Sequence, residues 1–449
     1  MTTQSQARPY GADLKPKRAA WIGVYALLIF SPLIIWALGL RPIEREFLRE
    51  LSVALGFLGL SLMGLQFVPT ARLPFLTKVA DMDTLYTMHH KLSILAFLLV
   101  LAHPLLLFVE NPFTLRLLNL ATAPWRARAG VTAVLFLIAL VATSIWRKEL
   151  EIHYEPWQWA HDLLSIGIAG LSLYHIFNVN YYTAVPAQRI LWIVLAGIWG
   201  AGLLYTRVIR PWNMLRHPYE VTEVKEELGD SWTLTVTPKG HEGMSFRPGQ
   251  FAWLVIWKSP FSISSHPFSF ASSAEQSQHI QFTIKELGDW TKRIKDVPIG
   301  KEMYLDGPYG TFGIDDYDAP GYIFIAGGSG SVPFLSMLRT MADRDDQRPV
   351  YFFYGNWNMD TCICRDDLDA LEEQLNLEVI HVLESPPEDW TGETGFVTKD
   401  VLDRHLPPER TEYQCFICGP LPMIENVELA LEALEIPEYQ SETEKYEMA

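Results

Sequence analysis

Four histidines on two apolar segments carry the strongest chemical signal in this chain. The segment HHKLSILAFLLVLAH contains His89 and His103, and HDLLSIGIAGLSLYH contains His161 and His175. Each pair is 14 residues apart, so in a helix both members face within roughly 40° of one direction and lie about 21 Å apart along the axis. Two such helices side by side would form two histidine sites at different levels. Neutral imidazole is a common axial ligand of haem iron, so the spacing predicts two stacked bis-histidine haems.

A simpler explanation is available for each histidine taken alone. A single histidine on an apolar face is often a hydrogen-bonded core residue. Ionisable side chains are costly within a membrane helix, however, and usually mark a functional site there. His90 precedes His103 by 13 residues, which turns it roughly 140° away from that face. His89 is therefore the expected ligand, and His90 is the alternative.

The histidine-bearing segments belong to a set of six apolar stretches long enough to span a bilayer. These stretches run approximately over 20–40, 47–68, 86–109, 130–147, 157–178 and 188–208. Positive charges near their ends show a modest bias that favours both termini on the cytoplasmic side. The third and fifth helices then run in the same direction, which puts His89 and His161 near the inner end and His103 and His175 near the outer end. No cleavable signal peptide is expected, because the polar N-terminus leads into a segment too long for one.

Composition and charge limit the possible functions. The chain has 449 residues, enough for two or three domains, and 49% of them are hydrophobic. The formal net charge of −16 arises mostly after residue 218, so a nucleic-acid-binding function has no support. Only four cysteines occur, Cys362, Cys364, Cys415 and Cys418, which argues against a disulfide scaffold. Their C-x-C and C-x-x-C spacings could form a metal site, but each pair is expected within a strand and no suitable histidine lies beside it.

After a linker around 211–220, the hydrophobic pattern changes from helical to alternating. Strands separated by turns, one of them at Gly229-Asp230, predict a small antiparallel barrel up to about residue 315. From residue 320 strands alternate with helices, which is typical of a parallel sheet. We therefore expect a multi-domain fold with a six-helix transmembrane bundle, an antiparallel β-barrel and an α/β domain. The expected parts are a tail over 1–19, the bundle over 20–210, the barrel over 216–315 and the α/β domain over 316–449.

A glycine-rich turn, Gly327-Gly328-Ser329-Gly330, lies between the first strand of the α/β region and a helix. Small residues let the backbone approach a pyrophosphate, and the helix N-terminus supplies N–H groups. Cys418-Gly419-Pro420 follows another buried strand, so both segments are expected at strand carboxyl ends, where open α/β sheets bind ligands. The turn could equally be a tight strand-to-helix connection, and Cys418 could be a buried structural residue.

Polar residues of the barrel region indicate a flavin site. His266-Pro267-Phe268-Ser269 follows Arg247-Pro248-Gly249-Gln250-Phe251 along the chain. The Ser269 hydroxyl could hydrogen-bond a flavin ring nitrogen, and His266 could contact phosphate or the adenosine part. The other candidates for this site, which include an anion-binding turn, are Arg247, Gln250, Lys285, Gly288 and Thr291. Each of them taken alone would be an ordinary turn or strand residue.

Together these motifs resemble the ferric reductase and NADPH oxidase superfamily, in which a six-helix di-haem domain precedes a ferredoxin-NADP-reductase-like module. The resemblance covers about 20–449, and its motifs are the paired histidines, RPGQF, HPFSF, IKELGDWT, GPYG, IAGGSGSVPFLSML and ICGPLPM. It implies that His266 to Ser269 and Thr291 hold FAD, and that the glycine turn and Cys418-Gly419-Pro420 hold the nicotinamide nucleotide. Tyr446 resembles the aromatic residue that many members place against the flavin, and a disordered tail is the alternative.

Two departures from the family pattern bear on the chemistry. Members that use NADPH often carry an arginine just after the strand that here reads FFYGNWN. Asn356 and Trp357 occupy that stretch, and Arg365 comes only later, so the choice between NADPH and NADH stays open. Ser269 replaces the commoner threonine and should keep its hydroxyl function.

The resemblance implies a multi-pass oxidoreductase of the cell (inner) membrane, with its N-terminus and C-terminal domains in the cytoplasm. Electrons from NAD(P)H would pass through FAD and two haem b groups to an acceptor on the other side. That small-molecule acceptor would be oxygen, giving superoxide or peroxide, or ferric iron. One alternative is an electron conduit to a partner protein or a quinone, and another is a transporter with a regulatory nucleotide domain and no haem. The oligomeric state stays open.

Overall fold

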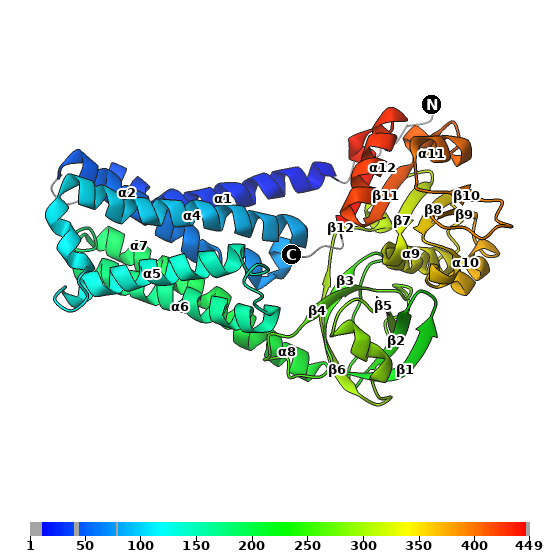
Figure 1. Cartoon of the computed structure of the whole chain (residues 1–449), viewed down its shortest axis with the longest axis horizontal. Helices are drawn as coiled ribbons and strands as arrows, with labels where there is room; N and C mark the ends of the chain where they lie inside the picture. Colours follow the sequence, from blue (N-terminus) through cyan, green and yellow to red (C-terminus); the bar gives the residue numbers. More distant parts are fainter. Residues whose placement is uncertain (1–10, 40–44, 78–79, 446–449) are drawn as a thin grey trace, which may run out of the picture. The chain divides into compact units, whose positions relative to one another are not determined.

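The chain divides into two compact units, Asp13–Pro211 and a second unit from Trp212 onward. The structure is a computed structural model that describes residues 11–39, 45–77 and 80–445. The first unit is helical, and the second contains two sheets with helices (Figure 1). Tyr446, the aromatic residue proposed to lie near the flavin, falls outside the described residues.

Long helices make up the first unit. They are α1 (Gly11–Ala37), α2 (Phe47–Leu65), α4 (Met82–Glu110), α5 (Trp125–Ile145), α6 (Tyr154–Val179) and α7 (Pro186–Leu204). Shorter elements connect or extend them, namely η1 (Pro69–Ala71), α3 (Pro74–Thr77), η2 (Pro112–Leu118), the π-helical turn η3 (Tyr205–Ile209) and α8 (Arg210–Arg216). Within the described ranges, six helices are long and apolar enough to cross a membrane, which confirms the six predicted spans. The fourth begins at Trp125 rather than near 130.

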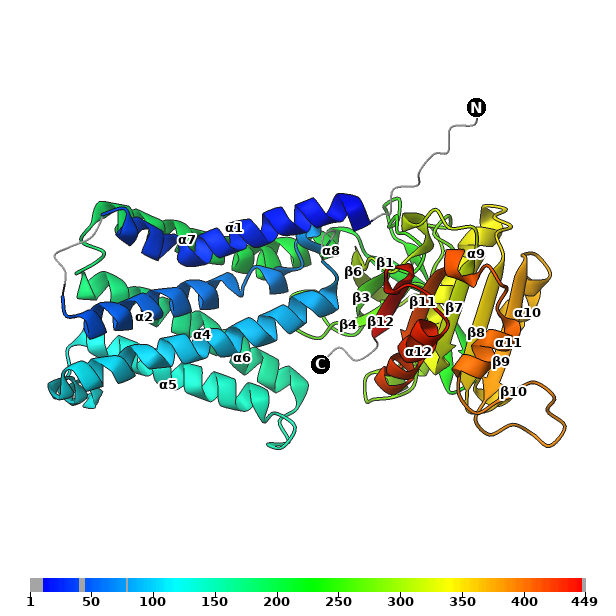
Figure 2. The same ribbon diagram turned by 90° about the horizontal axis from the view of Figure 1, so that it is seen from above.

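The outer surface of this helical unit is apolar. Large side chains such as Leu98, Leu105 and Leu163 are more than half exposed, which in water would leave several hydrophobic groups unburied. In both views α2 lies along α4, and α5 lies along α6 (Figure 1 and Figure 2). Gly59 allows the close approach of α2, because a Cβ there would lie 2.9 Å from the backbone nitrogen of Val100. Small residues at helix contacts and apolar outer faces are typical of membrane bundles.

The first sheet of the second unit is antiparallel, as predicted. Its strands are β1 (Tyr219–Glu227), β2 (Ser231–Pro238), β3 (Phe251–Val255), β4 (His266–Ser269), β5 (Ile280–Lys285) and β6 (Glu302–Tyr309). They lie in the order β4-β3-β6-β1-β2-β5, and every pairing is antiparallel. The Ala271 N–H donates to the Gln281 carbonyl at 2.8 Å, just beyond β4. In the part of the chain that the structure describes, no ladder joins β4 to β5, so closure into a barrel stays a prediction.

The second sheet is parallel, which confirms the predicted α/β pattern. Its strands are β7 (Tyr322–Gly327), β8 (Val350–Asn356), β9 (Leu377–Leu383), β10 (Glu393–Thr394), β11 (Gln414–Gly419) and β12 (Ser441–Lys445). Its helices are α9 (Val332–Asp343), α10 (Arg365–Glu372), α11 (Lys399–His405) and α12 (Leu421–Ala433). The strand order is β10-β9-β8-β7-β11-β12. The order reverses between β7 and β11, and such a switch point is where open α/β sheets bind ligands.

None of the four cysteines forms a disulfide, and all four are buried. Cys415 and Cys418 lie in β11 as predicted. The prediction that Cys362 and Cys364 lie in a strand was wrong, because β8 ends at Asn356 and both residues occupy the turn before α10. The side chain of Asn358 accepts a hydrogen bond from the Thr361 N–H at 3.1 Å. This cap starts a short 3₁₀ helix and stops the strand from continuing.

Candidate cofactor sites

The structure brings the four predicted histidines together as two pairs. The ring centres of His89 on α4 and His161 on α6 are 6.3 Å apart, and those of His103 and His175 are 6.5 Å apart. A bond between a metal and an imidazole nitrogen is about 2 Å long, so a metal held between two rings separates their centres by about 6 Å. Both pairs have the separation that a bis-histidine metal centre requires.

The His103–His175 pair is oriented by backbone oxygens. Nδ1 of His103 lies 3.0 Å from the Ser52 carbonyl oxygen, and Nδ1 of His175 lies 2.7 Å from the Arg126 carbonyl oxygen. These contacts favour the tautomer with the proton on Nδ1, which leaves Nε2 free to bind a metal. A Cβ on Gly130 would lie 2.9 Å from Nδ1 of His175, so a glycine makes room for this ring.

The His89–His161 pair has different surroundings. Nδ1 of His89 is buried, and among the described residues it has no hydrogen-bond partner. Nδ1 of His161 lies 3.9 Å from a carboxylate oxygen of Asp162. His90, the alternative ligand, is exposed, whereas His89 faces His161. The geometry therefore agrees with the helical phase that favoured His89.

The glycine turn and the Cys418–Pro420 segment meet at the switch point of the parallel sheet. A Cβ on Gly330 would lie 2.1 Å from the Cys418 carbonyl oxygen, and one on Gly419 would lie 3.1 Å from the Gly327 nitrogen. These glycines are needed because the two backbones touch. Gly328 differs, since it has a φ of +54° and open space where a side chain would be. It is the position of the turn where a ligand could approach the backbone.

Helix N-termini flank this switch point. Ser329 lies in the turn η6 (Gly328–Ser331), which leads into α9, and Pro420 immediately precedes α12. The free N–H groups at such helix starts attract phosphate. The Cys418 side chain is fully buried, so this residue contributes its backbone to the contact with the glycine turn and its thiol to the core.

The predicted flavin residues lie on β4 and on two turns next to it. Ser269 is buried and pairs with Phe251 of β3. The Gln250 side chain accepts a hydrogen bond from the Arg247 N–H at 2.8 Å and donates one to the Gly310 carbonyl at 3.0 Å. The Arg247 guanidinium forms an ion pair with Asp316. Gln250 therefore shapes the turn before β3 through its side chain.

A second turn holds Gly288 and Thr291. The Thr291 hydroxyl accepts hydrogen bonds from the N–H groups of Leu287 and Gly288, each at 2.9 Å. Lys285 is the last residue of β5 and pairs with Ser231 of β2. The hydroxyl thus orders the backbone of the predicted anion-binding turn.

Two tryptophans absent from the predicted set complete this region. Trp290 stacks on Phe268 with ring centres 5.4 Å apart, and its ring lies 4.4 Å from that of His266. Trp257 packs edge-on against Trp290 at 5.0 Å. Trp290 joins β4 to the 288–291 turn, so it supports both halves of the candidate flavin site. The tryptophan in the IKELGDWT motif is the sequence feature from which the role of Trp290 could have been predicted.

One cluster of sulfur and carboxylate groups lies between the two sheets of the second unit. Donor atoms of Glu227, Cys364 and Asp367 lie within 4.8 Å of one another. Nζ of Lys225 is 3.1 Å from Glu227, and a guanidinium nitrogen of Arg339 is 3.0 Å from Asp367. Burial raises the pKa of Cys364 to about 12. Both carboxylates are already paired with cations, so the cluster is a neutralised ion-pair network.

We expect the cysteines of the native protein to resist alkylation. Burial raises the pKa of Cys362, Cys364 and Cys415 to about 12 in each case, so roughly one thiol in 10⁴ is ionised at pH 8. Iodoacetamide followed by mass spectrometry should detect almost no modification in native protein and modification of all four thiols after denaturation. Rapid native labelling at any of the three would contradict the buried, protonated assignment.

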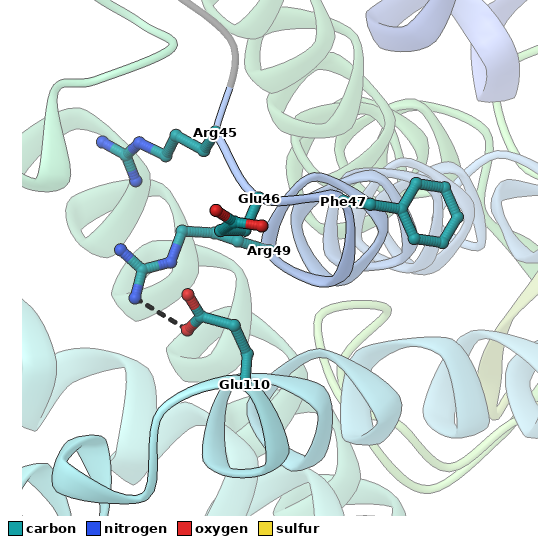
Figure 3. Close-up of a pocket in the computed structure, with 5 residues that line it drawn as sticks. All are labelled: Arg45, Glu46, Phe47, Arg49 and Glu110. Atoms are coloured by element: carbon teal, nitrogen blue, oxygen red, sulfur yellow. Dashed lines mark hydrogen bonds and ion pairs between the residues drawn. The ribbon is translucent and has the colours of Figure 1, made fainter.

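A polar hollow of about 510 Å³ lies at the start of α2, lined by Arg45, Glu46, Phe47, Arg49 and Glu110. Figure 3 shows the Arg49 side chain directed toward Glu110, with Phe47 pointing the other way. The Arg49–Glu110 distance is 2.9 Å. Ser52, one turn further along α2, contacts His103. The hollow therefore lies at the His103 end of the bundle.

Comparisons with known families match both units. The family described as a ferric reductase like transmembrane component matches residues 55–172. An FAD-binding domain family matches residues 230–312, and an oxidoreductase NAD-binding domain family matches residues 324–428. The three matches follow one another along the chain without overlap.

Individual relatives cover part of the chain. NADH-cytochrome b5 reductase 1 of Pyricularia oryzae is 32% identical over 36% of this chain and 55% of its own length. The reductase component of propane 2-monooxygenase from Rhodococcus jostii is 30% identical over 50% of this chain and 62% of its own length. The chain thus spans little more than half the length of these curated relatives.

Solved structures are more distant. The FAD/NAD-binding domain of nitric oxide dioxygenase from Vibrio cholerae is 18% identical, with a TM-score of 0.45, over 51% of this chain and 98% of that one. Among the family matches, a ferric reductase transmembrane domain precedes FAD-binding and NAD-binding domains in one polypeptide. This order of domains matches that of the ferric reductase and NADPH oxidase superfamily.

Proposed function

We propose that this chain is a membrane flavocytochrome. It moves electrons from cytoplasmic NAD(P)H through FAD and two stacked b-type haems to an acceptor on the other side of the membrane. The observation that carries the proposal is the separation of 6.3 and 6.5 Å between the paired histidine rings. Haem supplies one-electron chemistry when bound, whereas the protein determines ligation, spacing and local polarity.

The second unit supplies the donor side of this proposal. The N–H groups of the glycine turn and of the α9 and α12 starts would hold the pyrophosphate of the nucleotide. The Ser269 hydroxyl would hydrogen-bond the flavin ring, while His266 and the 288–291 turn would contact its phosphates. Trp290 would keep these two elements in register by stacking on β4.

The direction of transfer follows from where the chain leaves the bundle. α7 continues through η3 and α8 into the second unit. Arg207, in η3, pairs with Asp162 next to His161. The His89–His161 pair therefore lies at the end of the bundle where the chain leaves α7 and continues into the second unit. This arrangement supports His89 and His161 as the inner site and His103 and His175 as the outer site.

The hollow beyond His103 is large enough for a small polar acceptor. Its volume of about 510 Å³ falls in the range of ligand pockets, roughly 300–1,000 Å³. Arg45 and Arg49 provide positive charge there, and Glu46 and Glu110 balance it, so charge at the hollow does not select one acceptor. We propose either a ferric chelate or oxygen as the acceptor.

The experiment that tests the function compares acceptors under one donor. Full-length protein in lipid vesicles would receive NADH together with either a ferric chelate or oxygen, and ferrous iron and superoxide would be measured side by side. Ferrous iron formation well above superoxide formation supports the chelate, and the opposite result establishes an oxidase. Reduced haem with neither product would instead favour a conduit to a quinone or a partner protein. Absence of haem would favour the transporter alternative and overturn the proposal.

The residues at the end of β8, which would meet the adenosine ribose, indicate that NADH is the donor. Asn356, the last residue of β8, has a buried and uncharged amide side chain. Trp357 follows it and is 59% exposed. The next cation along the chain is Arg365, which lies 3.9 Å from Asp369. A 2′-phosphate would meet an uncharged amide and an indole at this edge.

We therefore expect kcat/KM to be at least about tenfold higher for NADH than for NADPH, since a charge-assisted hydrogen bond to the phosphate would contribute about 1.5–3 kcal/mol. Trp357→Arg should raise kcat/KM for NADPH about tenfold. Leu429→Arg, at an exposed position on α12, is the matched control and should leave the ratio unchanged. A wild-type protein that prefers NADPH would contradict the assignment.

A further inference from the structure

An ion pair lies directly beside one member of the His89–His161 pair. Asp162 follows His161 on α6, and one of its carboxylate oxygens lies 3.9 Å from Nδ1 of His161. The other carboxylate oxygen pairs with the Arg207 guanidinium. Both charged side chains are about a quarter to a third exposed. The imidazole therefore has a carboxylate within reach, but that carboxylate is held by a cation.

Arg207 meets Asp162 within an irregular turn at the end of α7. Tyr205–Ile209 forms a π-helical turn with Arg207 near its middle. A π turn inserts one extra residue, which rotates the following residues by about 100° relative to a regular α-helix. Such turns are rare and occur frequently at functional sites. The departure from regular helix is thus a second, independent feature that directs a cation to the neighbour of His161.

The two histidine pairs differ at their Nδ1 atoms. In the other pair, Nδ1 of His103 and Nδ1 of His175 lie within 3.0 Å of uncharged backbone carbonyl oxygens. His161 instead has a charged carboxylate nearby, at a distance beyond hydrogen-bonding range. Ring separations are nearly the same in both pairs, so the two sites differ at the ligand atoms in the charge beside His161 and in the lack of a hydrogen-bond partner for Nδ1 of His89 among the described residues.

We propose that the Asp162–Arg207 pair sets the reduction potential of the His89–His161 site, an inference that rests on the proposed haem function. A carboxylate that accepts a hydrogen bond from a ligand imidazole raises its basicity, which stabilises the oxidised metal and lowers the potential. Arg207 keeps Asp162 from making that bond and offsets its charge. The pair thereby keeps the inner site able to accept electrons from the flavin side.

Substitutions of the two residues should shift the potential in opposite directions. Arg207→Gln frees Asp162 to bond to His161, so the potential of this site should fall. Asp162→Asn leaves the Arg207 cation uncompensated, so the potential should rise. Each shift should change the electron distribution between the two sites about tenfold, which corresponds to 59 mV for one electron. The double variant should return close to the wild-type value, as expected for two coupled residues.

The test is a spectroelectrochemical titration of the purified full-length protein, after haem has been quantified in each variant. Arg210→Gln is the matched control, because Arg210 lies in the next turn and its guanidinium contacts the Ala71 carbonyl at 3.4 Å. Arg207→Lys, which keeps the charge, should retain the wild-type potential, and the His103–His175 site should stay unchanged throughout. If Arg207→Gln fails to bind haem, the other two variants test the proposal. The potential should rise in Asp162→Asn and should keep the wild-type value in Arg207→Lys.

The possible failures are distinguishable. A wild-type protein without haem would overturn the proposed function itself. Two haems with potentials that do not move, or that move in the same direction in Arg207→Gln and Asp162→Asn, would overturn only the role of the ion pair. A general loosening of the bundle would shift the reduction potential in the same direction in both variants.

Discussion

Replacement of any one of the four paired histidines by alanine is expected to remove one haem and leave the other. Each proposed site has two imidazole ligands, with ring centres 6.3 Å apart in one pair and 6.5 Å apart in the other. Haem content should therefore fall by about half in His89→Ala, His103→Ala, His161→Ala and His175→Ala. NADH-driven reduction of the external acceptor should be lost in all four, because the sites lie about 21 Å apart and neither can be bypassed.

His90→Ala is the matched control for this series. His90 neighbours His89 on α4 but is exposed, whereas the ring that faces His161 is that of His89. Pyridine haemochromogen assays should give the wild-type haem content for His90→Ala and half of it for His89→Ala. The reverse pattern would mean that α4 is turned by one residue at this level. Four single variants that all keep full haem content would rule out these residues as ligands.

Gly330→Ala is expected to reduce kcat/KM for NADH by about 100-fold. The added Cβ would lie 2.1 Å from the carbonyl oxygen of Cys418, a backbone atom of β11 that cannot rotate away. The glycine turn would have to move from the sheet, and a displacement of about 1 Å can cost about 100-fold in rate. NADH–ferricyanide reductase activity of the full-length protein measures this effect without involving the haems.

Gly355→Ala provides the control in the same sheet. Its Cβ would meet its nearest neighbour, the Ala326 carbonyl oxygen, at 3.4 Å, which is ordinary van der Waals contact. FAD content of both variants should match that of the wild type, since neither glycine lies on the flavin strands. Wild-type activity in Gly330→Ala would show that the turn and the 418–420 segment do not form the nucleotide site.

Features that follow from a regular repeat could be predicted from the sequence. The six spans follow from apolar length, and the facing of His89 toward His161 follows from helical phase. The parallel sheet follows from the alternation of strand and helix patterns. The start of α5 at Trp125 was missed because Arg126 and Arg128 interrupt the apolar run there. Charge near the end of a span hides the helix from a hydrophobicity pattern.

Features that depend on pairing across the chain could not be predicted. β12 has the sequence SETEK, which has no apolar alternation, and it is a strand because it pairs with β11. The structural role of Trp290 depends on its contacts with His266 and Phe268, which precede it by more than twenty residues in the sequence. The Asp162–Arg207 pair depends on an irregular turn whose position no periodic pattern reveals. Each of these needed the tertiary arrangement.

The central claim is that NADH delivers electrons to two bis-histidine haems in this chain. The most direct measurement is an anaerobic absorption spectrum of the purified full-length protein before and after NADH, with haem and FAD quantified per chain. The expected result is two low-spin b-type haems and one FAD per chain, with the flavin and both haems reduced by NADH. A preparation without haem, or with haem that dithionite reduces and NADH does not, would contradict the claim.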